Sequence, residues 1–243
     1  MKKPIASLPL VILHGWAVNP DNQAKWQPLI EKLTRSGKTV RFLGLPGLTT
    51  ALKEVWQLSD YVHWLDQQLN GQRVVLIGHS FGGQLAVRFT TVFPQQVERL
   101  ILIDSAGIRP FTSKAKIKRL IFSTVAKLGK AVFPFEFGRV ILHKLAREKD
   151  YLYASPILRK TMQNVLEDEV LGDLAALQVT TCLIWGAQDS ITPLTHGRLF
   201  AKNIPQNQLH IILGARHSPQ FTHVQQVADQ ILAFLTETDH HQK

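Results

Sequence analysis

The chain has 243 residues, of which 45% are hydrophobic and 19% are charged, a composition typical of a globular protein. A chain of this length can form one α/β domain with a large buried core. No apolar run approaches the roughly 18 residues that a membrane-spanning helix needs, and the single cysteine, Cys182, excludes an internal disulfide. We therefore expect neither a membrane span nor a disulfide framework, and we expect Cys182 to be a small core residue.

The first strand is predicted at residues 8–13. Two lysines near the N-terminus resemble the front of a signal peptide, but the apolar stretch that follows is short. It runs into His14 without a cleavage site of small residues. We therefore interpret residues 8–13 as a core strand and expect a cytoplasmic protein.

Strands and helices then alternate along the first hundred residues. Apolar residues at helical spacing predict helices at 26–37, 56–69 and 84–93, and short apolar runs predict strands at 39–43, 74–77 and 97–103. Further strands are predicted at 179–185 and 209–213, and a closing helix at 221–234. This order predicts an α/β fold with a doubly wound, mainly parallel sheet.

The alternation stops between residues 108 and 178, where the pattern is helical. We interpret this stretch as a helical lid, inserted into a core that consists of residues 1–107 and 179–243. Thirteen Lys and Arg residues lie between Ala106 and Lys160 against three acidic residues, and this excess equals the net charge of +10 of the whole chain. The positive charge is therefore concentrated on the lid.

A basic amphipathic lid has three interpretations. The first is a solvated basic face whose apolar underside roofs the site below it. The second is peripheral contact with an anionic membrane surface or with an acidic acyl substrate. Nucleic-acid binding is the third, and we expect none because no nucleic-acid motif accompanies the charge.

An acidic patch lies late in the lid, and no His or Cys stands at ligand spacing with it. We interpret it as a solvated helix face and not as a metal site. The patch consists of Glu167, Asp168, Glu169 and Asp173.

Residues 78–82 (GHSFG) fit the pattern G-x-S-x-G between a predicted strand and a predicted helix. This context is that of a nucleophile elbow. The tight reversal forces Ser80 into a strained backbone conformation, and its flanking glycines avoid collisions with neighbouring elements. We predict that Ser80 is a nucleophile; the alternative is a serine in a glycine-rich turn without a catalytic role.

Two backbone N–H groups are predicted to face the Ser80 hydroxyl. Phe81 follows the serine directly, and Trp16 follows the first strand in the loop His14-Gly15-Trp16. Ligands bind outside the carboxyl ends of the strands in such sheets, so both groups can stabilise an oxyanion. His14 could be a base, but we favour a structural hydrogen-bonding role for a histidine at this strand end.

Asp189 and His217 follow the two late strands at their carboxyl ends, and we expect them to meet Ser80 there. A serine hydroxyl needs a base to take its proton, and an acid fixes the tautomer of that base. His217 is predicted as the base and Asp189 as the acid, with Asp104 as a rival acid at another strand end. Weaker candidates for the base are His79, His196, His210 and His223.

Four motifs together resemble the α/β-hydrolase superfamily of serine hydrolases. They are residues 14–16 (HGW), 78–83 (GHSFGG), 185–193 (WGAQDSITP) and 214–217 (GARH). The resemblance covers about residues 1–107 and 179–235, and the chain order Ser, Asp, His is that of the superfamily's triad. It implies the α/β-hydrolase fold, the triad Ser80, Asp189 and His217, and an oxyanion hole of Trp16 and Phe81.

Two further comparisons concern single segments. Residues 150–159 resemble the lid of small bacterial members. Many relatives carry D-x-P-G-x-G after the second strand, where this chain has Gly44 in place of the Asp and Thr49 in place of the final Gly. This departure concerns the shape of one loop near the site and not the triad.

The expected activity is that of an esterase-like serine hydrolase acting on a small-molecule acyl substrate, without a metal or an organic cofactor. The same triad serves thioesterases, C–C bond hydrolases and acyltransferases, and fold does not choose between them. A non-catalytic binding protein that uses the pocket or the basic lid is the alternative from another class. The sequence does not indicate the oligomeric state.

Overall fold

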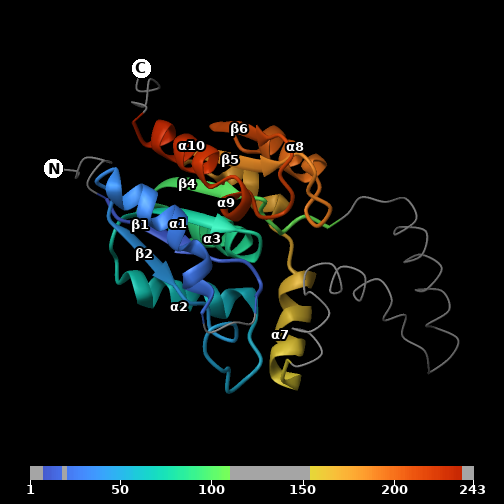
Figure 1. Ribbon diagram of the computed structural model, residues 1–243. Coiled ribbons are helices and arrows are strands. Elements are labelled where there is room, and N and C mark those ends of the chain that lie inside the picture. Colours follow the sequence, from blue (N-terminus) through green and yellow to red (C-terminus); the bar gives the residue numbers. More distant parts are fainter. Residues whose placement is uncertain (1–7, 18–20, 110–153, 237–243) are drawn as a thin grey trace, which may run out of the picture.

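A six-stranded parallel sheet forms the centre of the computed structural model, which describes residues 8–17, 21–109 and 154–236 (Figure 1). The strand order is β2-β1-β3-β4-β5-β6, and every neighbouring pair is parallel. The predicted doubly wound parallel sheet is thus confirmed. The strands are β1 (Leu10–Leu13), β2 (Val40–Leu43), β3 (Val74–His79), β4 (Val97–Ile103), β5 (Thr181–Gly186) and β6 (Asn207–Ile212).

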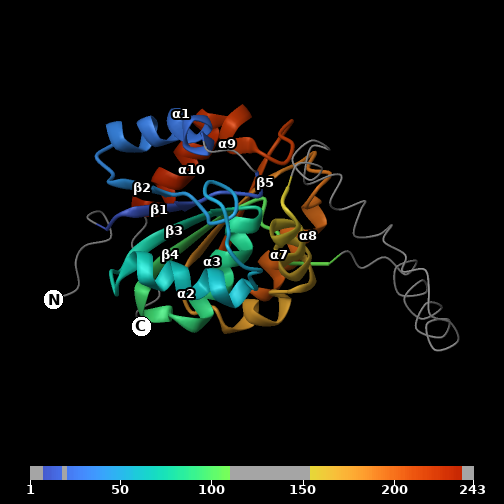
Figure 2. The same cartoon turned by 90° about the horizontal axis from the view of Figure 1, so that it is seen from below.

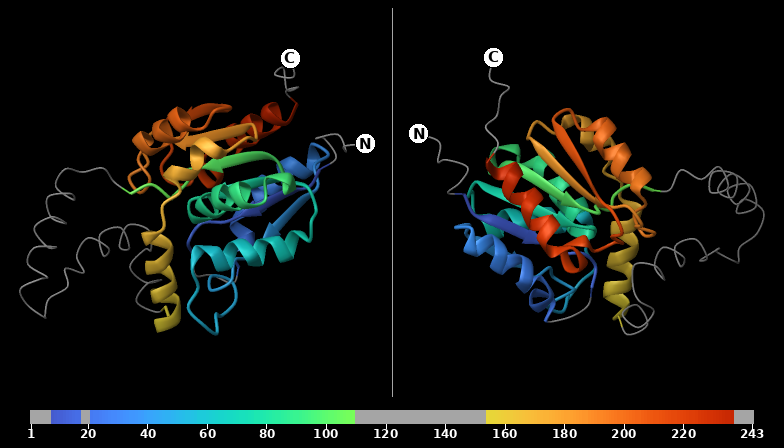
Figure 3. Two further views of the ribbon diagram at one scale, coloured as in Figure 1. Left: turned by 180° about the vertical axis from the view of Figure 1, so that it is seen from behind. Right: turned by 45° about the horizontal axis from the view of Figure 1, so that its top comes forward.

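Helices cover both faces of the sheet (Figure 2). One face packs against α1 (Asn22–Arg35) and α10 (Val224–Thr236), which cross it side by side in the right-hand view of Figure 3. The other face packs against α2 (Leu58–Leu69), α3 (Phe81–Val92) and α8 (Leu194–Asn203). The inner strands β1, β3, β4 and β5 are buried almost throughout, whereas the edge strands β2 and β6 are partly exposed. Strands buried on both faces need continuous apolar runs, which is why such runs located the inner strands.

The order of the strands places the site. The chain moves from β1 outward to β2 and then crosses back to β3 on the other side of β1. Such a switch leaves a crevice outside the carboxyl ends of β1 and β3. The loop after β1 and the turn after β3 carry Trp16 and Ser80, so both lie at this crevice.

Three elements differ from the sequence-based expectation. Helix α8 was not predicted, because its buried residues include His196 and Gly197 beside a single large apolar side chain, Phe200. The predicted closing helix is divided into a short α9 (Pro219–Thr222) and α10, because His223 between them has a non-helical backbone with φ −130° and ψ 45°. A short 3₁₀ turn, η2 (Pro94–Gln96), joins α3 to β4.

The last part of the predicted lid packs against the sheet's helices. It forms α7 (Pro156–Glu167) and the 3₁₀ helix η3 (Leu171–Ala176), both helical as expected. The buried side chains Leu158 and Val165 of α7 and Leu174 of η3 join the same apolar cluster as α2 and α3. The rest of the lid, with the basic stretch from residue 114 to 149, lies outside the described residues.

No helix among the described residues is long and apolar enough to cross a membrane. Cys182 is buried in β5, as its apolar surroundings predict.

Candidate active site

The turn between β3 and α3 presents Ser80 at the carboxyl edge of the sheet. Ser80 has φ 52° and ψ −117°, a region that L-residues rarely occupy, in agreement with the strained elbow that the motif predicts. Gly82 has no room for a side chain, because a Cβ there would overlap the carbonyl groups of Leu13 and His14 in the loop after β1. The Ser80 carbonyl accepts hydrogen bonds from the N–H groups of Gly83 and Gln84, which fixes the turn.

The structure brings together the three side chains that the sequence singles out. His217 Nε2 lies 3.0 Å from Ser80 Oγ, and His217 Nδ1 lies 2.8 Å from Asp189 Oδ2. These distances are those of hydrogen bonds. Residues that follow β3, β5 and β6 therefore form one continuous chain of hydrogen bonds from hydroxyl to carboxylate.

Four hydrogen bonds hold the Asp189 carboxylate in place. Oδ1 accepts from the N–H groups of Ile191 and Thr192, while Oδ2 faces His217 and the Thr192 hydroxyl, 2.7 Å away. Burial opposes ionisation of the group, but the bonds from His217, Thr192 and Ile191 outweigh it, and the pKa of Asp189 lies below its usual value. Asp189 is thus an anion that can orient His217. Thr192 had been noted only as part of a motif, and its contact with Asp189 was missed.

Asp104, the rival acid, lies next to this chain but does not hold the histidine. It is fully buried, and one carboxylate oxygen accepts the Gly186 N–H at 2.8 Å. Its other oxygen, Oδ2, has no hydrogen-bond partner among the described residues. Burial and the neighbouring charge of Asp189 raise the pKa of Asp104 to about 9, so its carboxyl group is neutral at pH 7.

His14 has the structural position that was favoured for it. Its ring is buried and stacks on Phe42 with ring centroids 5.4 Å apart. Nε2 accepts the Leu45 N–H at 3.0 Å, so the neutral ring carries its proton on Nδ1, which lies 2.7 Å from the Gly15 carbonyl. Burial lowers the pKa of His14 to about 4, which keeps this tautomer uncharged.

His79, a weaker candidate for the base, contacts the backbone of His217, the predicted base. Its Nε2 lies 2.8 Å from the backbone carbonyl of His217. Burial and the neighbouring His217 lower the pKa of His79 to about 3, so the ring is neutral and donates this bond. The other weaker candidates lie on α8, on β6 and at the end of α9, and only His217 is bonded to Ser80 among the described histidines.

The two predicted oxyanion donors lie beside Ser80. Phe81 is the first residue of α3, where a backbone N–H has no acceptor within the helix. The side chain of Trp16 lines the same pocket as Ser80, and its ring centroid lies 5.4 Å from that of Phe81. Their role as an oxyanion hole remains a prediction.

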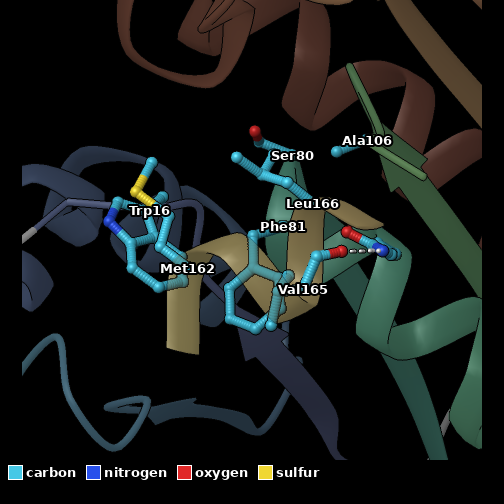
Figure 4. Close-up of a pocket in the computed structure, with 8 residues that line it drawn as sticks. Trp16, Ser80, Phe81, Ala106, Met162, Val165 and Leu166 are labelled. Carbon is cyan, nitrogen blue, oxygen red and sulfur yellow. Dashed lines mark hydrogen bonds between the residues drawn. The ribbon is translucent and has the colours of Figure 1, made fainter. Parts of the chain in front are cut away.

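A small pocket opens at Ser80, with about 270 Å³ of empty space including its mouth (Figure 4). No charged side chain lines it among the described residues, and its only polar lining residues there are Ser80 and Gln84. The apolar lining comes from two parts of the chain: Trp16, Phe81 and Ala106 from the core, and Met162, Val165 and Leu166 from α7. Sequence reasoning missed the α7 residues, because a helical pattern does not show what the helix packs on.

The interpretation of the acidic patch as a solvated helix face was wrong for Asp168, Glu169 and Asp173, whereas Glu167 is exposed on α7 as expected. Arg88 of α3 forms ion pairs with Asp168 at 2.7 Å and with Asp173 at 2.9 Å, and Arg109 pairs with Glu169 at 3.5 Å. These three residues follow the end of α7 and join that segment to the core.

The departure after β2 has a local explanation. A Cβ at Gly44 would lie 2.6 Å from the Thr49 hydroxyl, so the side chain of Thr49 occupies the space that a residue at position 44 would need. Gly44 does not have the positive φ of Gly47, so this contact alone excludes a side chain. The two departures are therefore coupled.

Asp104, Asp189 and His217 form the only group of three possible metal ligands in the described parts of the chain. Their ligand atoms lie within 4.8 Å of one another. Because His217 already uses both ring nitrogens, for Asp189 and Ser80, the arrangement suits proton transfer better than metal binding.

Comparisons with known proteins identify the family and the fold. The model of the alpha/beta hydrolase family matches residues 10–230. A 2-hydroxymuconate semialdehyde hydrolase from a Pseudomonas species is 25% identical over 256 residues, covering 96% of this chain and 89% of its own. A 2-hydroxy-6-oxononadienedioate/2-hydroxy-6-oxononatrienedioate hydrolase from Pseudomonas putida is also 25% identical, with 93% and 87% covered.

Solved structures share the fold. A thermophilic esterase from Thermogutta terrifontis superposes with a TM-score of 0.67 at 23% identity, covering 94% of this chain and 89% of that one. A meta-cleavage product hydrolase from Pseudomonas fluorescens has a TM-score of 0.67 at 17% identity, with 94% and 90% covered.

Proposed function

Since the chain belongs to the alpha/beta hydrolase family, we propose that it is a serine hydrolase that cleaves a carboxylic ester or a related acyl bond. Ser80 attacks the acyl carbonyl while His217 Nε2 takes the hydroxyl proton, and Asp189 stabilises the imidazolium that forms. The N–H groups of Trp16 and Phe81 bind the oxyanion. His217 then protonates the leaving alcohol, and a water molecule activated by His217 releases the acid.

The observation that carries this proposal is the position of His217 between the other two side chains. Its nitrogens lie 3.0 Å from the Ser80 hydroxyl and 2.8 Å from the Asp189 carboxylate. A serine is a weak nucleophile until a base is within hydrogen-bond reach, and both contacts of the base are present. A binding protein would have no need for this arrangement.

The pocket indicates the substrate class. Its apolar lining suits the hydrocarbon part of an acyl group, and a charged group in it would lose its hydration without a charged partner among the described residues. We therefore expect activity on esters with an uncharged acyl chain.

A fluorophosphonate probe tests the proposal, because it reacts only with an activated serine. We expect covalent labelling of the wild-type protein at Ser80 and turnover of p-nitrophenyl esters. Ser80→Ala should abolish both, and the matched control Ser59→Ala, on the exposed surface of α2, should change neither. No labelling of the folded wild-type protein would favour the binding protein.

A second candidate is hydrolysis of a C–C bond by the same triad. It is favoured by the similarity to the 2-hydroxymuconate semialdehyde hydrolase and to the meta-cleavage product hydrolase. The two candidates are separated by comparing kcat/KM for p-nitrophenyl butyrate and for 2-hydroxymuconate semialdehyde. A higher value for the second compound would assign the C–C reaction.

A further inference from the structure

Helix α7 supplies one wall of the pocket. Met162, Val165 and Leu166 line it together with core residues such as Trp16 and Phe81 (Figure 4). The position of this helix therefore determines how much space lies in front of Ser80. Contacts that hold α7 in place therefore affect which substrates fit the pocket as well as the stability of the fold.

One side chain of α3 reaches the end of this wall. Gln84 follows Ser80 by four residues, so it lies one helical turn beyond the nucleophile, and it is 2% exposed. Its Nε2 donates to the carbonyl of Val165 at 2.9 Å and to that of Asp168 at 2.7 Å. Both hydrogens of one amide are thus used on α7, and Figure 4 shows the first of these bonds.

The accepting carbonyls lie where a helix needs external donors. The last carbonyl groups of a helix lack a full set of N–H partners within it. Val165 lies in the last turn of α7, where its carbonyl also accepts the N–H of Asp168 at 3.3 Å, and Asp168 is the residue that ends the helix. Gln84 therefore caps the carboxyl end of α7 from another helix.

A second attachment holds the middle of α7. The Thr161 hydroxyl accepts the Trp56 N–H at 3.0 Å, and the Asn164 amide donates to the Trp56 carbonyl at 3.2 Å. The segment that carries Met162 and Val165 is therefore attached both to Trp56 and to Gln84. Only the Gln84 attachment comes from a residue that itself lines the pocket.

We propose that Gln84 is a positioning residue that sets the depth of the acyl pocket by fixing α7, so that short acyl chains are preferred. This inference rests on the proposed esterase function. The helix that begins with the Phe81 N–H donor also carries the contact that places the α7 wall. The oxyanion site and the acyl wall are therefore positioned by one rigid element.

Gln84→Met tests the inference, because methionine has a similar shape but donates no hydrogen bond. Without the two bonds the wall can retreat, and longer chains gain contact inside the pocket. We expect the ratio of kcat/KM for p-nitrophenyl octanoate to that for the butyrate to rise at least about threefold, a small part of what added methylenes can contribute in a pocket. The change should appear mainly in KM.

Thr90→Val is the matched control. Thr90 is buried on the same helix, and its hydroxyl donates within that helix, to the Ala86 carbonyl at 2.7 Å. This variant also loses one buried hydrogen bond, so it reports any general effect of weakening α3. Its octanoate-to-butyrate ratio should equal that of the wild type.

Gln84→Glu provides a second measurement if the methionine variant does not fold. A carboxyl group facing carbonyl oxygens donates a hydrogen bond only when it is protonated. We expect the ratio to be near that of the wild type at low pH and to rise with pH, and the comparison of two substrates cancels any pH dependence that both reactions share. A ratio that is unchanged in the folded Gln84→Met variant, or independent of pH in Gln84→Glu, would overturn the inference.

The outcomes also separate this inference from the proposed function. If wild-type Ser80 labels with fluorophosphonate and the ratio does not respond to Gln84, only the positioning role fails. If wild-type Ser80 does not label, the esterase function fails and the inference fails with it.

Discussion

Asp104 and Asp189 show how two neighbouring carboxyl groups receive opposite properties from their surroundings. Asp189 accepts four hydrogen bonds, and its pKa lies below the usual value, whereas Asp104 accepts one from the Gly186 N–H, and burial raises its pKa to about 9. Two carboxylates so close together do not both ionise easily. The number of available donors, which a sequence does not display, decides which one is the anion.

Asp189→Asn should lower kcat about 10³- to 10⁴-fold, because an amide cannot hold His217 in the tautomer that accepts the serine proton. Asp104→Asn should change kcat by less than about tenfold, since its neutral carboxyl group does not contact His217. Steady-state hydrolysis of p-nitrophenyl butyrate measures both effects. The assignment of the acid would be reversed if Asp104→Asn had the larger effect.

The loop after β2 departs at two positions from the D-x-P-G-x-G pattern, and a side chain at Gly44 would need the space that Thr49 occupies. Gly44→Ala should destabilise the protein by about 1–3 kcal/mol, because the new methyl group overlaps the Thr49 side chain. Adding Thr49→Gly removes that overlap, so the double variant should be more stable than Gly44→Ala alone. Urea unfolding of the four proteins measures the coupling energy.

Additive effects of the two substitutions would contradict this explanation. A small loss in Thr49→Gly alone is expected in either case, because glycine increases the entropy of the unfolded chain.

The strands and the elbow could be predicted because their signals are local. Residues 74–82 carry an apolar run, a glycine-flanked serine and a helix start within one short segment. Helix α8 carries no such signal and was missed. Its fit depends on Gly197, where a Cβ would touch the Trp185 ring, and a contact of this kind is not visible in the order of residues.

The triad could be predicted for a different reason. Parallel strands place their carboxyl ends at one edge, so polar residues that follow separate strands converge there. No comparable rule predicts which residues of α7 line the pocket. The bond from Gln84 to Val165 joins positions 81 residues apart, and nothing in either segment indicates the other.

At the scale of the whole molecule, three buried groups predict how stability depends on pH. His14 and His79 have pKa values lowered from 6.5 to about 4 and about 3, so they stay neutral when the unfolded chain would already bind protons. Their contribution is present above pH 6.5 and is lost as the pH falls through these values. Asp104 has the opposite effect on stability. Its pKa is raised from 3.8 to about 9, so between these pH values the folded protein holds a proton that the unfolded chain has lost, and stability falls as the pH rises.

We therefore expect the free energy of unfolding to be highest near pH 6.5. On the alkaline side it should fall by up to about 1.4 kcal/mol per pH unit, the limit for one proton. Urea unfolding at about pH 5, 6.5 and 8.5 measures this profile. Asp104→Asn should flatten the alkaline side, and an equal slope in this variant would show that another group is responsible.

The backbone conformation of Ser80 bears on the evolution of this position. At φ 52° and ψ −117° the residue occupies a conformation that is unstrained for glycine and strained for serine. Strain of this kind costs about 1–3 kcal/mol. A descendant that no longer needed its hydroxyl would gain stability by replacing this serine with glycine, so selection for activity has to be continuous for the serine to persist.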